Sequence, residues 1–175
     1  MDPRLATLQR EIASSIAGLA PRDLTCGVPG KWCSAEILEH LYLTYTGTAK
    51  GFSRLLEATR SLATKATWKQ RGRSFVVTRL GYMPTGRKAP AMALPGGISP
   101  AKVTSEIDTA IRQMDELMTL CARKFGTRSK VLDHPILGPL SIEQWRKFHL
   151  VHGLHHVKQI RRLRADISAG RISKE

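Results

Sequence analysis

Histidine is the residue type in this chain whose spacing points most directly to chemistry. Four of the six histidines lie between positions 149 and 156. At about 100° per residue, His149, His152 and His156 fall on one face of a helix, together with the apolar residues that would bury that face. His152 and His156 are one turn apart, so their ring nitrogens can converge on a single divalent ion.

Burial of these rings requires a partner for each of them. A buried polar group without a hydrogen bond costs about 1–3 kcal/mol, which is a large part of the 5–15 kcal/mol that stabilises a small domain. A divalent transition metal would satisfy His152 and His156 together, provided that another element supplies a third ligand. The alternative is a hydrogen bond from each ring to a carboxylate or a backbone carbonyl. We expect His155, about 100° away from His156, to flank the site. His149 is expected to support it, with direct ligation as its alternative role.

His40 is the best candidate for a third ligand. The only other histidine outside the last segment is His134, which could orient a ligand or lie in an exposed turn. His40 is at the edge of the inward face of a predicted helix, beside the small residues Thr44, Gly47 and Gly51. Glycine inside a helix costs about 1 kcal/mol relative to alanine, so the space has a use. Close helix packing is the other explanation.

Four helical segments must position these histidines. Asp2 before Pro3 and Ser99 before Pro100 are typical helix starts. Apolar residues then recur at helical spacing as far as Leu19 in the first segment and as far as Gly126 in the third. The second segment is predicted over residues 34–62, with Ser34 as its cap.

The last helix is predicted to begin after Ser141, with Gln144 completing a capping box. Its apolar face ends at Leu163, and we expect the chain to fray beyond that residue. Because no convincing set of strands accompanies the four segments, the sequence predicts an all-α protein. The expected architecture is a four-helix bundle in a single domain over residues 1–175, with a long basic crossover between the second and third helices.

The crossover carries much of the positive charge. The chain has 28 Lys and Arg against 14 Asp and Glu, a net charge of +14, and no acidic residue occurs from 58 to 105. We predict that this basic segment binds an anionic part of a substrate or cofactor around the site, through Arg71, Arg73 or Arg79. A solvated basic face without a specific ligand is the alternative. Residues 81–99 are predicted to be a loop, whereas SFVVTRLGYM fits a short helix or an extended piece, so the conformation of residues 63–98 stays open.

The sequence lacks the apolar segments that would direct the protein to a membrane or out of the cell. There is no apolar run of about 18 residues, and the first segment, MDPRLATLQREI, carries charge throughout. We therefore expect a cytoplasmic protein without a membrane partner. Three cysteines, Cys26, Cys33 and Cys121, form no CxxC pair, which indicates neither a disulfide framework nor a cysteine zinc site.

Two stretches resemble a known family. KWCSAEILEHL at 31–41, followed by HLVHGLHHVKQI at 149–160, resembles the DinB-like (YfiT-like) family of metal-dependent hydrolases. The resemblance implies a four-helix bundle in which one histidine of the second helix and an HxxxH pair of the fourth hold a divalent metal. The matching positions are His40, His152 and His156, and Gln159 matches the end of the motif. HPILGPLSIEQW at 134–145 resembles a branch of that family of unknown function.

The leading functional hypothesis is a three-histidine site for zinc, nickel, iron or manganese. Three neutral ligands leave the charge of the ion undiminished, so the pKa of a bound water could fall to about 7. The resemblance also includes thiol-dependent S-transferases, so hydrolysis and thiol transfer both stay open. The substrate would be a small molecule, anionic or a thiol, and the resemblance leaves a homodimer open. No catalytic acid or base is assigned, because Glu36 and Glu39 are predicted to point away from the core face.

A second hypothesis comes from a different class of protein. The net charge would also suit a non-enzymatic binding or stress-response module whose metal site is structural or vestigial. Nucleic acid is the natural partner to consider. Against it, no recognised nucleic-acid motif is present, and only 6% of residues are aromatic, which leaves little for base stacking.

Overall fold

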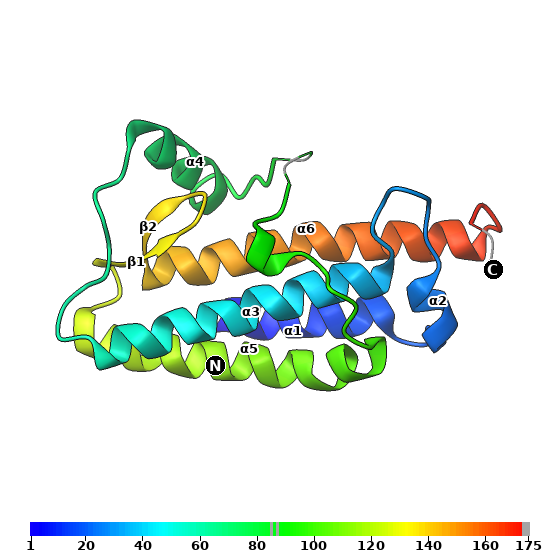
Figure 1. Cartoon of the computed structure of the whole chain (residues 1–175), viewed down its shortest axis with the longest axis horizontal. Coiled ribbons are helices and arrows are strands. Elements are labelled where there is room, and N and C mark those ends of the chain that lie inside the picture. The colour runs from blue at the N-terminus through cyan, green and yellow to red at the C-terminus, as the bar shows by residue number, and fades with distance from the viewer. Residues whose placement is uncertain (85, 87, 173–175) are drawn as a thin grey trace.

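The computed structural model describes residues 1–84, 86 and 88–172 (Figure 1). Within them the chain is mostly helical, which confirms the predicted class, but a small antiparallel sheet was not predicted. The elements in order are α1 (Pro3–Ile16), α2 (Pro21–Thr25), α3 (Ser34–Glu57), α4 (Trp68–Thr78), the 3-10 turn η1 (Ala91–Ala93), α5 (Pro100–Phe125), β1 (Lys130–His134), β2 (Gly138–Ser141) and α6 (Ile142–Ser168).

Three of the long helices begin at the capping residues that the sequence predicted. The side chains of Asp2, Ser99 and Ser141 each accept a hydrogen bond from a backbone N–H in the first turn of α1, α5 and α6. At α3 the cap is Cys33 rather than Ser34, and its N–H donates to Glu36 Oε2 at 2.8 Å. These start points fix the helical phase, and therefore which side chains face inward.

Two helix ends differ from the prediction. α3 ends at Glu57 rather than at residue 62, because the chain turns away to reach the sheet, where Leu62 N donates to Val131 O at 3.0 Å. α6 continues to Ser168 instead of fraying after Leu163, because Ile167 is buried in a small cluster with Cys26 and Ile172.

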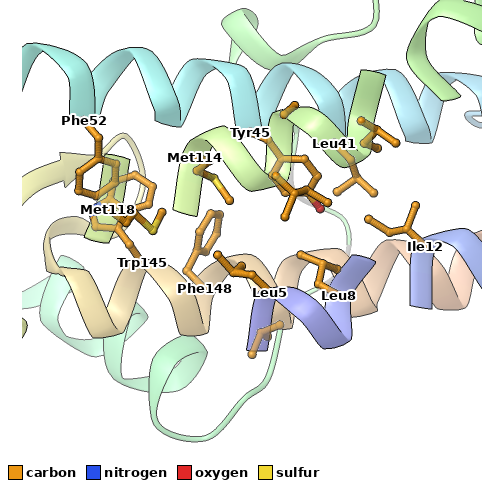
Figure 2. Close-up of a cluster of buried hydrophobic side chains, with 14 of the residues drawn as sticks. Leu5, Leu8, Ile12, Leu41, Tyr45, Phe52, Met114, Met118, Trp145 and Phe148 are labelled. Atoms are coloured by element: carbon orange, nitrogen blue, oxygen red, sulfur yellow. The ribbon is translucent and has the colours of Figure 1, made fainter. Parts of the chain in front are cut away.

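Four long helices, α1, α3, α5 and α6, lie side by side (Figure 1). α3 packs most extensively on α5, and α1 packs most extensively on α6. Figure 2 shows their apolar faces meeting in one core, with Leu5 and Leu8 from α1, Tyr45 from α3, Met114 from α5 and Phe148 from α6. No helix in the described part of the chain has an apolar stretch of the length that a bilayer crossing requires.

The connection between α5 and α6 contains a β-hairpin. β1 pairs antiparallel with β2, with Leu132 opposite Leu140 and His134 opposite Gly138. Periodicity could not reveal it, because every residue of β2 is buried and the strand therefore shows no alternation. Gly138 has φ +71°, and a Cβ there would lie 2.7 Å from the Gln70 side chain, so the hairpin packs closely against α4.

The basic crossover contains one helix. SFVVTRLGYM is helical as far as Thr78 within α4, and the rest of it is irregular. Residues 81–99 form the predicted loop apart from η1, and positions 85 and 87 of that prediction lie outside the described residues.

An interior ion pair ties the start of α6 to the middle of α5. Arg146 donates to Asp115 Oδ1 from Nε at 3.1 Å and from Nη2 at 2.8 Å, and also to Thr119 Oγ1 at 2.7 Å. The backbone N–H of Asp2 donates to the other carboxylate oxygen of Asp115 at 2.7 Å. One buried carboxylate therefore joins α1, α5 and α6.

Close contact between α1 and α6 depends on Gly153. A Cβ at Gly153 would lie 2.2 Å from Leu8 Cδ1, and Leu8 is fully buried and cannot swing aside. We expect Gly153→Ala to lower the free energy of unfolding by about 1–3 kcal/mol in urea denaturation. Gly47→Ala is the matched control, because nothing lies within 4 Å of a Cβ there. It should raise stability by about 0.5–1 kcal/mol. Stabilisation by both substitutions would contradict the packing described.

Candidate metal centre

Three histidines selected from the sequence meet between α3 and α6. His152 Nε2 lies 3.1 Å from His40 Nε2 and 3.2 Å from His156 Nε2. One ligand atom from each ring lies within 4.8 Å of those of the other two. His40 and His156 are buried, with 4% and 8% of their surface exposed. The structure thus brings the sequence-predicted ligands to one point.

The outer ring nitrogens of two of these histidines show where their protons are. A carbonyl oxygen can only accept, so His40 Nδ1 donates to Ala93 O at 2.7 Å. His156 Nδ1 likewise donates to Gln159 Oε1 at 2.8 Å. In a neutral imidazole the other nitrogen then carries a lone pair. Both of these Nε2 atoms therefore present lone pairs to His152.

The donor set fits a divalent transition ion. His152 Nε2 has at most one proton, which can satisfy one of the two facing lone pairs and not both. A cation placed between the three nitrogens would accept all three lone pairs. Zinc–nitrogen bonds of about 2.0–2.1 Å in tetrahedral geometry place ligand nitrogens about 3.3–3.4 Å apart, close to the separations seen here.

Electrostatics favour the neutral, ligating form of each ring. Burial is the main cause that lowers the pKa of His40 and His152, and it lowers the pKa of His156 to about 4. Mutual repulsion among the three rings acts in the same direction on His152 and His156. At pH 7 protons therefore do not compete with a metal for these nitrogens.

His152 differs from the other two rings in its outer nitrogen. Its Nδ1 is buried and has no hydrogen-bond partner among the described residues. The ring instead stacks on Phe148, with centroids 5.2 Å apart and planes 12° apart. Packing, rather than a hydrogen bond, holds this ring in place.

The segment around η1 fastens the orientation of His40. Glu39 is 3% exposed, and its carboxylate accepts N–H bonds from Gly96 at 2.7 Å and Gly97 at 3.1 Å. These bonds hold the segment that contains Ala93 against α3. Glu39 is therefore buried beneath this loop and bonded to its backbone, whereas Glu36 stays at the helix start. The loop glycines were the available signal for this attachment, but nothing in residue type marks the carbonyl of Ala93.

Trp32 covers one side of the centre. Its ring lies 5.1 Å from that of His40, so this tryptophan packs on a candidate ligand. Gly51, expected to leave room beside His40, instead faces the hairpin, because a Cβ there would lie 3.0 Å from Leu132 Cδ2. Close packing, the alternative explanation, accounts for this glycine.

His149 lies in an aromatic cage beside the three histidines. It is fully buried, and its ring lies 5.7 Å from Trp145, 5.6 Å from Tyr45 and 5.0 Å from Phe148. Neither ring nitrogen has a partner among the described residues. Burial, with a smaller contribution from His134, lowers its pKa to about 3. No hydrogen bond among the described residues joins it to His40, His152 or His156, so its supporting role stays a prediction.

His134 and Gln159 are possible supporting residues, and that role stays a prediction. Gln159 Oε1 accepts from His156 Nδ1, and Gln159 Nε2 donates to His155 Nε2 at 3.2 Å. His134 Nδ1 accepts two N–H bonds in the hairpin turn, from Ile136 and Leu137, both at 3.1 Å. Its ring packs on Phe148 at 4.4 Å and on Trp145 at 5.3 Å, and Phe148 in turn stacks on His152.

The predicted anion-binding arginines lie away from the histidines. α4 packs against β2 and the start of α6, at one end of the molecule (Figure 1). Arg71 and Arg79 line a cavity there, and Arg73 is not among its lining residues. Arg71 and Arg79 thus line a cavity of their own, and anion binding by these arginines stays a prediction.

Comparison with known proteins identifies a family. A family model described as "Protein of unknown function (DUF1569)" matches residues 9–163. The chain therefore belongs to this family. No curated protein and no solved structure matches the chain.

Buried neutral histidines make stability depend on pH. The folded pKa values of His149, about 3, and His134, about 4, lie below the 6.5 of an ordinary histidine. The unfolded chain therefore takes up protons first as the pH falls. The contribution of these histidines to the free energy of unfolding is fully present above pH 6.5. Below pH 6.5 the free energy of unfolding should decrease by about 1.4 kcal/mol per pH unit for each such histidine.

Urea unfolding of the wild type and His149→Phe between pH 7.5 and pH 4.5 measures this effect. The variant should have the shallower pH dependence and should lose little stability at pH 7.5, because no hydrogen bond is removed. An unchanged slope, or a loss above about 2 kcal/mol at pH 7.5, would mean that the ring is charged or hydrogen bonded.

Proposed function

We propose that this member of the DUF1569 family is a DinB-like metal-binding enzyme. His40, His152 and His156 would hold one zinc, nickel, iron or manganese ion and leave at least one coordination position open for a substrate group. The observation that carries the proposal is the convergence of the three Nε2 atoms, two of which present lone pairs to the third.

The arrangement of the long helices supports this relationship. We propose that α1, α3, α5 and α6 form the four-helix bundle of DinB-like proteins. His40 comes from the second long helix, and His152 and His156 come from the fourth. This is the ligand pattern that the resemblance implies.

The chemistry follows from a buried ion with neutral ligands. Such an ion supplies Lewis acidity, which polarises a carbonyl or phosphoryl oxygen and lowers the pKa of a water or thiol. The chain itself orients the ligands, because Ala93 O and Gln159 Oε1 hold the outer protons of His40 and His156. Trp32 shields the His40 ring from water. Hydrolysis and thiol transfer both use this arrangement.

A structural metal is the second candidate, favoured by the location of the site. α3 and α6 pack on each other less extensively than α3 packs on α5 or α1 on α6. An ion that joins His40 to His152 and His156 would therefore clamp two pairs of helices. In that case the protein would be a non-enzymatic basic module.

Elemental analysis of purified variants tests the ligand assignment. We expect one transition ion per chain in the wild type and in His155→Ala, because His155 lies outside the set of three. His40→Ala, His152→Ala and His156→Ala should each lose the ion. Stoichiometric metal in any of these three variants would reject the assignment.

Gln159 offers a test of how the site is tuned. Gln159→Leu removes the acceptor for His156 Nδ1, and it should weaken metal affinity about 10–100-fold in competition with a chelator. Lys158→Ala, an exposed change one position away, is the matched control and should leave the affinity unchanged. Equal affinities for all three proteins would contradict a supporting role for Gln159.

Metal removal separates the enzyme from the structural alternative. For the enzyme, a chelator should abolish turnover of a panel of carboxylic esters, phosphate esters and thiol acceptors while the thermal midpoint changes little. For a structural clamp, the midpoint should fall by several degrees, and none of these substrates should be turned over before or after removal.

A further inference from the structure

A cavity of about 480 Å³ lies between α4, the hairpin and the start of α6. It is separate from the metal centre. Gln144 on its wall precedes His152 by eight residues of α6, which is about 12 Å along the helix. Nothing in the proposed metal chemistry uses this space.

The charge lining the cavity has one sign. Arg71, Arg79 and Lys130 line it, and no Asp or Glu is among its lining residues. The nearby carboxylate of Asp133 already accepts from Thr64 N at 3.0 Å and from Thr64 Oγ1 at 2.6 Å. Three cations without a facing acid favour an anion, and guanidinium groups bind phosphate through paired N–H donors.

A hydroxyl donor accompanies the cations. Ser74 is 6% exposed and lines the cavity, yet its Oγ has no hydrogen-bond partner among the described residues. A buried hydroxyl without a partner is destabilising, so an acceptor from a ligand would stabilise it. Thr78 lies beside it with its own proton committed to Ser74 O at 2.8 Å. It therefore offers only an acceptor, so Ser74 is the hydroxyl free to donate.

The walls are held in place before any ligand arrives. The Lys130 ammonium donates to Gln144 Oε1, which also accepts from Ser141 N in the cap of α6. Gly138 brings the hairpin backbone against Gln70 of α4, where a side chain would not fit. The cations thus project from elements that are packed on one another.

One side of the cavity is apolar. Phe75 lines it while 54% of its surface is exposed, and Leu137 and Pro139 complete that side. We propose that this cavity binds a small organic phosphate monoester. Its phosphate contacts Arg71, Arg79, Lys130 and the Ser74 hydroxyl, and its organic part packs on Phe75. A phosphate dianion matches the three cations and the hydroxyl better than a carboxylate, which has one charge and two oxygens.

Calorimetric titration of the full-length protein with phenyl phosphate tests the proposal. We expect saturable binding that is weaker for inorganic phosphate, which lacks the ring, and weaker for benzoate, which lacks the second charge. Arg71→Gln and Arg79→Gln should each weaken phenyl phosphate binding about tenfold or more. Arg73→Gln, the same charge change on the same helix but outside the cavity, should change it less than about twofold.

Two further variants separate this site from its alternatives. Ser74→Ala should weaken binding about threefold to tenfold without any change of charge. His152→Ala should leave phenyl phosphate binding unchanged, so this test is independent of the metal centre. No saturable binding, or equal losses for Arg71→Gln and Arg73→Gln, would overturn it. Tighter binding of a single-stranded oligonucleotide that depends equally on Arg73 would likewise identify the basic segment as a polyanion surface.

Discussion

Nitrogen lone pairs that face one another in a protein interior repel unless a proton or a cation lies between them. His40 and His156 have committed their outer protons to Ala93 O and Gln159 Oε1, so their inner nitrogens meet His152 as acceptors. One shared proton cannot satisfy this arrangement, whereas one divalent ion can. The segment around η1 and the packing of α3 against α6 maintain this arrangement.

The centre links the two halves of the helical core. α1 packs with α6 and α3 packs with α5 (Figure 1), so the ligands come from both helix pairs. Gly153 lets α1 approach α6 on the same turn that carries His152 and His156, and the buried Arg146–Asp115 pair ties the start of α6 to α5. Small changes in helix position would therefore change the distances between the ring nitrogens.

Sequence periodicity predicted which histidines meet because it reports helical phase. Once the cap at Ser141 fixed the start of α6, spacing alone placed His152 and His156 on its inner face. It could not find the Ala93 carbonyl, since any residue has one, nor the burial of Glu39, whose partners are backbone N–H groups of a distant loop. The hairpin was missed because a strand buried on both faces has no period of two.

X-ray absorption at the edge of the ion that copurifies with the protein tests the central claim most directly. The account predicts three imidazole nitrogens at about 2.0–2.1 Å in the wild type and no absorption edge from a bound ion in His40→Ala. A first shell that contains sulfur or fewer than three imidazole nitrogens, or an unchanged edge in His40→Ala, would contradict it.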